Sequence, residues 1–281
     1  MDWRRIPKAE LESHFNPRVA VPDVDIFLHR LVAASAAARQ RHRPETDIRY
    51  GDGPRQLLDL FRAAEPGGPI QIYLHGGYWR ALSKSDFSYM APPFTAAGAN
   101  VVVMDYDLCP DVTLDRIVAQ TIDCVRWVAR HGDAIGGDTD RIYLSGHSAG
   151  AHLAAMALAH DWTRDGLAAD LIKGAVLVSG IYDPAPVLAI SVNDDVRLTP
   201  EMAARNNACA HPPLGDGALL VAVGGDEPAG WIGQSVDYHT AAGPESALTI
   251  VADAHHFSIA LQMADPADPL CRATLDQIGL G

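Results

Sequence analysis

Short apolar runs recur along the chain in the pattern expected of buried strands. They cover residues 57–61, 70–74, 100–105, 141–145, 174–179, 218–223 and 247–251. Helical segments are predicted between most of these runs, at residues 84–97, 113–131, 149–160 and 232–242. The run from Val101 to Met104 is continuously apolar, as expected for a strand buried on both faces. Strands and helices in alternation predict an α/β fold, with a mostly parallel sheet of about eight strands and helices on both faces.

Two segments outside this pattern, one at the N-terminus and one within the chain, suggest how the chain is organised. Residues 1–45 are predicted to be mainly helical, and no linker divides the chain, so a single domain is expected over residues 1–281. The segment 182–216 is rich in proline, asparagine and aspartate and interrupts the alternation. We expect it to form a small cap or a loop over the strand ends, where ligands usually bind.

Composition narrows the class of protein. With 281 residues, of which 48% are apolar and 20% charged, the chain can bury the core of an ordinary α/β domain. The net charge of −13 argues against a nucleic acid partner, because phosphate binding needs clustered lysine and arginine. The basic groups at residues 4–8 and 39–43 are interpreted as solvated helix faces.

The cysteines, the N-terminus and the lengths of the apolar stretches bear on the cellular compartment. The four cysteines form no CxxC pair, so neither a zinc ribbon nor a redox pair is indicated. Residues 1–5 carry charge and lack the apolar core of a signal peptide. No apolar stretch approaches the roughly 20 residues that a membrane helix requires. We therefore expect a cytoplasmic protein without a membrane partner.

Ser148 stands at the centre of the strongest chemical motif, GHSAG at residues 146–150. The apolar run 141–145 precedes it and a run rich in small residues, 151–159, follows it, so the serine is expected at a sharp turn between a strand and a helix. Small neighbouring residues permit a strained turn, in which the serine hydroxyl projects away from the adjacent backbone. GxSxG alone is a weak signal, and this context favours a serine nucleophile.

A second motif, HGGYW at residues 75–79, follows the predicted strand 70–74. Histidine and glycines at this place are typical of a loop whose backbone N–H groups bind an oxyanion. We expect the N–H groups of Gly77 and Tyr78, together with that of Ala149 at the start of the helix after the serine, to form the oxyanion hole. His75 is interpreted as shaping this loop.

A serine hydroxyl needs a base within hydrogen-bond reach and a carboxylate that orients the base. With the nucleophile on such a turn, the chain order is serine, acid, histidine. The pair His255 and His256 follows the last predicted strand, and His256 is favoured over His255. Asp226 and Glu227 both follow the strand 218–223, and their positions leave the choice between them open.

Aromatic residues and possible metal ligands are the remaining candidates for contact with a ligand. Tyr78, Trp79 and Trp231 are candidates for an aromatic wall around a planar substrate, and Tyr182 is a further candidate for substrate contact. The histidines show no HxxxH or HxE spacing and the aspartates are scattered. No metal site is therefore expected.

Taken together, these motifs resemble the eukaryotic-type kynurenine formamidases (arylformamidases) of the α/β-hydrolase superfamily. The resemblance is carried by HGGYW at 75–79, GHSAGAH at 146–152 and VSGIYD at 178–183. The opening FNPR at 15–18 and YGDG at 50–53 are similar as well, so the resemblance spans nearly the whole chain.

The resemblance implies roles for particular residues. Ser148 would be the nucleophile and His256 the base. At the acid position this chain departs from the family, which typically has an aspartate there. Counting from Val223 and back from Trp231 places Glu227 at that position, so Glu227 is the expected acid, and a one-residue shift would make Asp226 the acid instead. The implied reaction is hydrolysis of N-formyl-L-kynurenine to formate and L-kynurenine through a formyl-serine, without metal or cofactor.

Two other functions are compatible with the same residues. A carboxylesterase acting on small aryl or alkyl esters or carbamates would use the same triad, because the pocket and not the fold sets substrate choice. A non-catalytic binding module of the same fold is the remote alternative. In each case the expected ligand is a small molecule, and a homodimer is a possible assembly.

Overall fold

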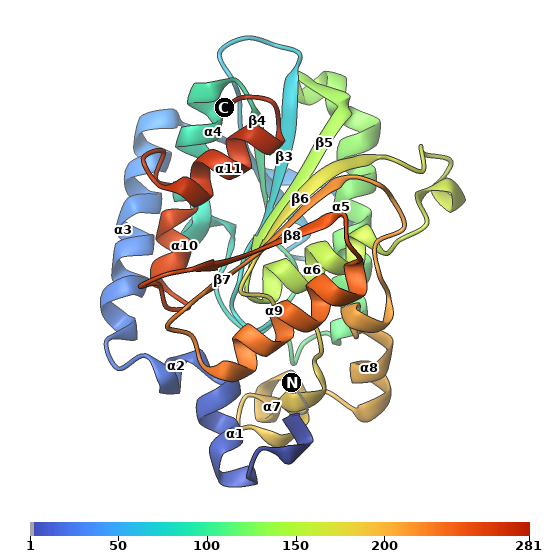
Figure 1. The fold of residues 1–281 in the computed structure, drawn as a ribbon. Coiled ribbons are helices and arrows are strands. Elements are labelled where there is room, and N and C mark those ends of the chain that lie inside the picture. Colours follow the sequence, from blue (N-terminus) through green and yellow to red (C-terminus); the bar gives the residue numbers. More distant parts are fainter. Residues whose placement is uncertain (1–2) are drawn as a thin grey trace.

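The computed structural model describes residues 3–281, apart from the side chain of residue 133. At its centre is an eight-stranded sheet with the order β1-β2-β4-β3-β5-β6-β7-β8 (Figure 1). The pairs β1–β2 and β2–β4 are antiparallel, and the remaining neighbours are parallel. The predicted mostly parallel sheet is confirmed. The strands are β1 (Glu45–Arg49), β2 (Leu57–Phe61), β3 (Gly68–Leu74), β4 (Asn100–Met104), β5 (Gly137–His147), β6 (Ile172–Val178), β7 (Ala218–Gly224) and β8 (Ser246–Val251).

Alternate residues of the strands face two helical layers. Val102 and Met104 of β4 pack in a cluster with α5, α6 and α9, whereas Val101 and Val103 pack in a second cluster with α3, α4, α10 and α11. Every residue of β4 is buried, which explains its continuously apolar sequence. These helices are α3 (Val24–His42), α4 (Ala91–Ala97), α5 (Leu114–Ile135), α6 (Ala149–Leu158), α9 (Ala229–Ala242), α10 (Ser258–Gln262) and α11 (Pro269–Gln277).

The N-terminal prediction needs a correction at its end. The helical part runs through α1 (Lys8–Phe15), α2 (Pro17–Ala20) and α3, which ends at His42, and Glu45 already begins β1. Residues 1 and 2 of the predicted segment lie outside the described residues. Strand β1 escaped prediction because it is an edge strand that pairs only with β2 and carries mostly exposed polar residues.

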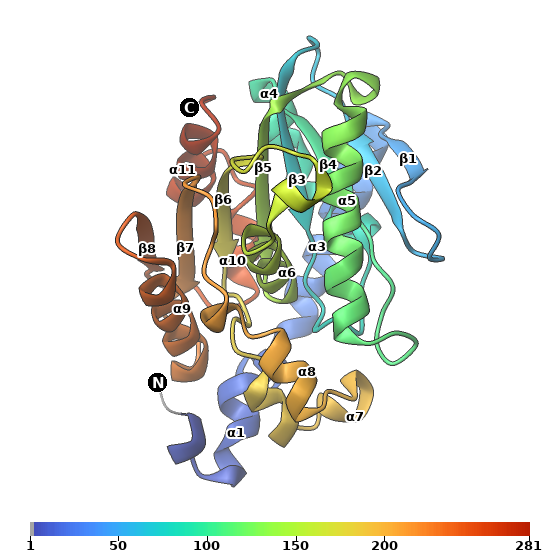
Figure 2. The same cartoon turned by 90° about the vertical axis from the view of Figure 1, so that its right-hand side faces the viewer.

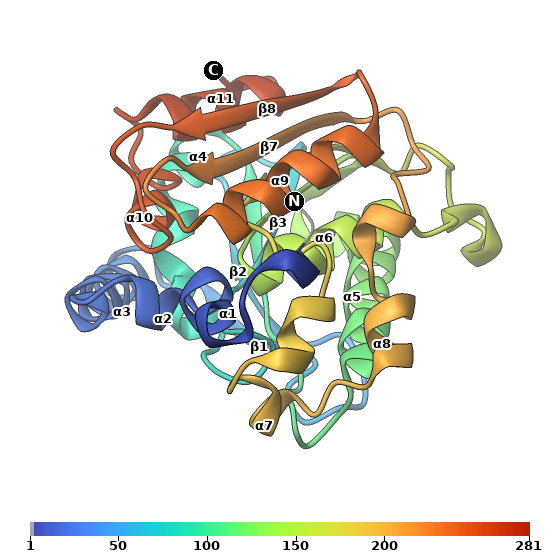
Figure 3. The same ribbon diagram turned by 60° about the horizontal axis from the view of Figure 1, so that its bottom comes forward.

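Short helices occupy the segment that interrupts the alternation. They are the 3₁₀ helix Ala185–Ala189, α7 (Asn193–Val196), α8 (Pro200–Arg205) and the 3₁₀ helix Ala208–Ala210. Further 3₁₀ helices lie at Trp3–Arg5, Lys84–Met90 and Trp162–Asp165. Helices α1, α7 and α8 gather at one end of the molecule (Figures 2 and 3). The Glu12 carboxylate of α1 accepts hydrogen bonds from the Ser191 hydroxyl (2.6 Å) and the Ser191 N–H (2.9 Å), which ties the two segments together.

None of the helices between residues 3 and 281 combines the length and the apolar character that crossing a membrane requires.

Candidate active site

Ser148 lies at the turn between β5, which ends at His147, and α6, which begins at Ala149. Its backbone adopts φ 58° and ψ −121°, a conformation that L residues rarely take. The Ser148 N–H donates to the carbonyl oxygen of Val178 at 2.9 Å, which pins the turn to the neighbouring strand β6. The strained turn therefore holds the serine between strand and helix, as expected of a nucleophile elbow.

Close packing explains the small residues around the serine. A Cβ on Gly150 would lie 2.0 Å from the carbonyl oxygen of Leu74, the last residue of β3. No side chain fits at such a distance, so the first turn of α6 can cross the end of β3 only with glycine at this position. The glycine of the motif is thus required by the approach of a helix to a strand.

His256 and Glu227 form a buried pair. The His256 Nδ1–H donates to Glu227 Oε2 at 2.7 Å, and the exposed fractions of the two side chains are 2% and 0%. The other carboxylate oxygen of Glu227 accepts from the Gly224 N–H at 2.9 Å and from the Ser179 hydroxyl. Both oxygens are satisfied, so the carboxylate is held in place and sets the orientation of the imidazole ring.

The structure separates the two carboxylates that the sequence left open. Asp226 is exposed, and its recorded hydrogen bond runs from its backbone N–H to the carbonyl oxygen of Ala254 (2.9 Å). Glu227 faces inward and contacts His256. The structure thus brings Glu227, and not Asp226, to the histidine, while the catalytic role of Glu227 stays a prediction.

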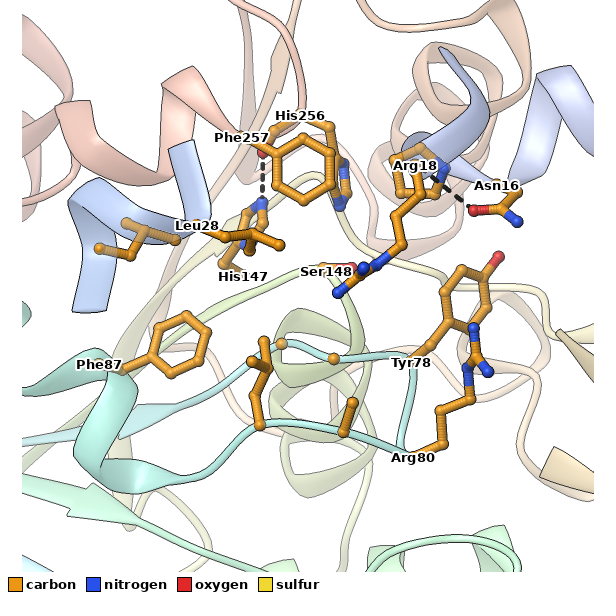
Figure 4. Close-up of a pocket in the computed structure, with 16 residues that line it drawn as sticks. Asn16, Arg18, Leu28, Tyr78, Arg80, Phe87, His147, Ser148, His256 and Phe257 are labelled. Carbon is orange, nitrogen blue, oxygen red and sulfur yellow. Dashed lines mark hydrogen bonds between the residues drawn. The ribbon is translucent and has the colours of Figure 1, made fainter. Parts of the chain in front are cut away.

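Two further histidines, His147 and His255, lie next to the catalytic candidates. His147 Nε2–H donates to the carbonyl oxygen of His256 at 2.8 Å (dashed line in Figure 4). Burial, followed by the nearby charge of His256, holds the pKa of His147 well below its usual value. A neutral His147 therefore anchors the backbone that carries His256. The ring of His255 instead packs edge-on against Phe27, with the ring centroids 4.5 Å apart.

The predicted oxyanion donors converge on the serine. Gly77 and Tyr78 border the same cavity as Ser148, and Ala149 is the first residue of α6. Among the described residues, none of these three N–H groups has a recorded hydrogen-bond acceptor. His75 supports the loop, since its Nδ1–H donates to the Gly76 carbonyl oxygen at 2.7 Å and its ring stacks on Tyr106. The donors are available to an oxyanion, and their role stays a prediction.

Ser148 and His256 both line a cavity of about 300 Å³. Figure 4 shows them on one side of it, with aromatic and aliphatic side chains around them. The further wall residues come from the N-terminal segment, from the segment after β3 and from the position after His256: Asn16, Pro17, Arg18, Leu28, Leu31, Arg80, Ala81, Leu82, Phe87 and Phe257. No residue of the segment 182–216 is among the residues that line this cavity.

Sequence reasoning missed most of this wall. The run FNPR at 15–18 stands out in the sequence only through the family resemblance, because nothing in its local pattern shows that it packs beside Ser148, more than a hundred residues away. Tyr78 does border the cavity, as predicted for an aromatic wall residue.

The other aromatic candidates are buried away from the cavity wall. Trp79 packs on His152 with ring centroids 5.1 Å apart, and Tyr182 stacks on Tyr238 at 4.3 Å. Trp231 lies 4.3 Å from the His256 ring and supports it from outside the cavity. The structure places these three side chains in the packing around the site and not among the residues that line the cavity.

Within residues 3–281, no cluster of three or more histidine, cysteine, aspartate and glutamate side chains is arranged to hold a metal ion. The site consists of a serine, a histidine with its carboxylate, and backbone N–H groups without a recorded acceptor around one cavity.

Comparison with known proteins agrees with this geometry. A family model described as the alpha/beta hydrolase fold matches residues 71–213. The chain is similar to the kynurenine formamidase of Danio rerio, with 36% identity over 99% of each chain, and to that of Salmo salar, with 35% identity over 99% of this chain and 98% of the relative. Among solved structures, a putative thioesterase from a Silicibacter species covers 96% of this chain and 98% of its own at 26% identity, with a TM-score of 0.82.

Proposed function

Since this chain belongs to the kynurenine formamidase family of α/β-hydrolases, we propose that it hydrolyses N-formyl-L-kynurenine to formate and L-kynurenine. It is a hydrolase, as its relatives are. The observation that carries the proposal is one cavity of about 300 Å³, of small-molecule size, bordered by both Ser148 and His256 and walled by aromatic and aliphatic side chains. An aryl formamide matches a wall of this kind.

In the acylation step, His256 Nε2 takes the proton of the Ser148 hydroxyl while Oγ attacks the formyl carbon. The negative charge that develops on the formyl oxygen is stabilised by the N–H groups of Ala149, Gly77 and Tyr78. The carbon–nitrogen bond then breaks, and protonated His256 hands its proton to the departing aryl amine. L-Kynurenine leaves, and a formyl-serine ester remains on Ser148.

Deacylation repeats the same chemistry with water. His256 takes a proton from water, and the hydroxide oxygen adds to the formyl carbon of the ester. The carbon–Oγ bond breaks, the proton returns to Ser148, and formate is released. Throughout, Glu227 holds the imidazole in the tautomer with hydrogen on Nδ1 and stabilises its charged form, as the 2.7 Å contact between them supports.

The proposal is tested by the hydrolysis rates of N-formyl-L-kynurenine and p-nitrophenyl acetate, with Ser148→Ala as the control. We expect the formamide to be strongly preferred and Ser148→Ala to reduce its turnover by at least about a thousandfold. If the ester turns over well and the formamide barely at all, the enzyme is a carboxylesterase with the same catalytic groups, and the substrate proposal fails.

We place the enzyme in the cytoplasm, in a reducing setting. The four cysteines are free thiols in the structure, which supports this location. The location and the possible homodimer both stay predictions.

A further inference from the structure

Two arginines border the active-site cavity of a strongly acidic protein. The net charge of the chain is −13, yet the charged residues among the described cavity-lining side chains are Arg18 and Arg80, and no aspartate or glutamate is among the residues that line the cavity. Apart from the titratable histidines His147 and His256, the wall is otherwise uncharged. The charged side chains that line the cavity are thus opposite in sign to the net charge of the chain.

The two arginines differ in their partners. Arg80 forms an ion pair with Asp195, so its charge is already compensated. Arg18 has no recorded ion-pair partner and no recorded side-chain hydrogen bond among residues 3–281. Figure 4 shows its side chain reaching from α2 into the cavity towards Ser148. An uncompensated guanidinium thus points at the place where a substrate would react.

The backbone beneath Arg18 is held in place. Asn16 caps α2, and its side-chain oxygen accepts from the Arg18 N–H at 3.2 Å. The Asn16 amide group in turn donates to Glu12 at 2.7 Å. The Tyr78 hydroxyl donates to the carbonyl oxygen of Phe15, which joins this segment to the oxyanion loop. These contacts fix the start of the Arg18 side chain relative to Ser148.

We infer that Arg18 forms a carboxylate subsite, so that the preferred substrates are aryl formamides that carry a carboxylate. This inference rests on the proposed function. A guanidinium binds a carboxylate through two parallel N–H···O bonds, and such charge-assisted hydrogen bonds are stronger than neutral ones. Arg18 thus offers a carboxylate a local positive charge in a chain whose net charge is negative.

The test compares two substrates that differ only in this group, N-formyl-L-kynurenine and its carboxamide. Arg18→Met is expected to lower kcat/KM for the carboxylate about 10- to 100-fold and to leave that for the carboxamide within about twofold. Arg18→Lys, which keeps the charge but loses the planar fork, should recover part of the loss. Arg80→Met is the matched control and should not discriminate between the two substrates.

Binding of the product gives a second measurement that needs no turnover. In calorimetric titrations, we expect Arg18→Met to weaken the binding of L-kynurenine at least about tenfold and to leave the binding of its carboxamide unchanged. Equal losses on both compounds, no loss on either, or a discriminating loss in Arg80→Met instead would overturn the inference. The proposed function fails separately, if the wild-type protein hydrolyses p-nitrophenyl acetate but not N-formyl-L-kynurenine.

Discussion

At the residue scale, the turn after β7 decides which of two adjacent carboxylates meets the histidine. The Gly225 N–H donates to the carbonyl oxygen of Val251 at 2.7 Å, and the Asp226 N–H to that of Ala254 at 2.9 Å. These bonds press the turn against the end of β8, where the chain leads to His256. With the backbone held there, the side chain of Asp226 faces solvent and that of Glu227 faces inward.

Exchanging each carboxylate for its amide separates the two residues. Glu227→Gln is expected to lower kcat by about a hundredfold or more, because an amide cannot stabilise the positive charge that His256 acquires during the reaction. Asp226→Asn, the matched control next to it, should keep kcat within about twofold of wild type, since Asp226 is exposed. Steady-state kinetics on the preferred substrate measures both, and the opposite ranking would assign the acid to Asp226.

At the scale of elements, the loop that follows β3 contains several consecutive residues with positive φ. Gly77 adopts φ 125°, and Tyr78 and Trp79 adopt φ 53° and 57°. The Cys109 N–H donates to the carbonyl oxygen of Trp79 at 2.8 Å, which helps to hold this conformation. Strained backbone persists only where its surroundings over-determine it, and here it places Gly77 and Tyr78 at the cavity that Ser148 also lines.

Two glycine substitutions separate the stability cost of backbone strain from the loss of activity caused by displacement of the loop. A Cβ on Gly77 would lie 2.1 Å from the carbonyl oxygen of Ala81, whereas a Cβ on Gly98, at the similar φ of 107°, has nothing within 4 Å. Gly77→Ala should therefore displace the loop and lower kcat about 100-fold or more. Gly98→Ala should cost about 1–2 kcal/mol of unfolding free energy through backbone strain and leave kcat unchanged.

Urea denaturation and steady-state kinetics on both variants check this prediction. An unchanged kcat in Gly77→Ala would show that the loop does not supply oxyanion donors.

At the scale of the whole molecule, one buried histidine links the helix after the nucleophile to the segment 182–216. The His152 Nε2–H on α6 donates to the carbonyl oxygen of Asn206 at 2.8 Å. Burial lowers the pKa of His152 from 6.5 to about 4. In the folded protein this ring therefore stays neutral well into the acidic range.

The lowered pKa gives the stability of the protein a defined pH dependence. Between pH 6.5 and about 4, the unfolded chain protonates this histidine and the folded protein does not. The unfolded state binds more protons in this range. The contribution of His152 to the free energy of unfolding is therefore fully present above pH 6.5 and falls as the pH drops towards 4. The loss from this residue is about 3 kcal/mol.

Removing the titrating group should flatten this dependence. In His152→Gln, the amide keeps a donor for Asn206, and the fall in unfolding free energy between about pH 7 and pH 4 should be smaller by about 3 kcal/mol. Urea denaturation at a series of pH values measures this fall. Each protein is compared with its own unfolding free energy at high pH, so that a loss of packing in the variant, which is the same at every pH, does not enter the comparison. Parallel curves for variant and wild type would contradict the prediction.

Parts of the fold were predictable because burial leaves a local trace in the sequence. Strands covered on both faces, such as β3 and β4, appear as apolar runs, and the nucleophile turn appears as small residues between a strand and a helix. Strand β1 and the helices α10 and α11 were not predicted. The exposed edge strand lacks an apolar run, and short helices carry too few turns for a clear period.

The sequence by itself determined the mostly parallel sheet, the places of its buried strands along the chain and the places of Ser148 and His256 after two predicted strands, because these features leave a local pattern in the sequence. Only the tertiary structure decided the rest: that Glu227 and not Asp226 meets His256, that Trp79, Tyr182 and Trp231 pack behind the site, and that the N-terminal segment carries Arg18 to the cavity. These outcomes depend on how distant segments pack against each other, and such contacts leave no periodic pattern in the sequence.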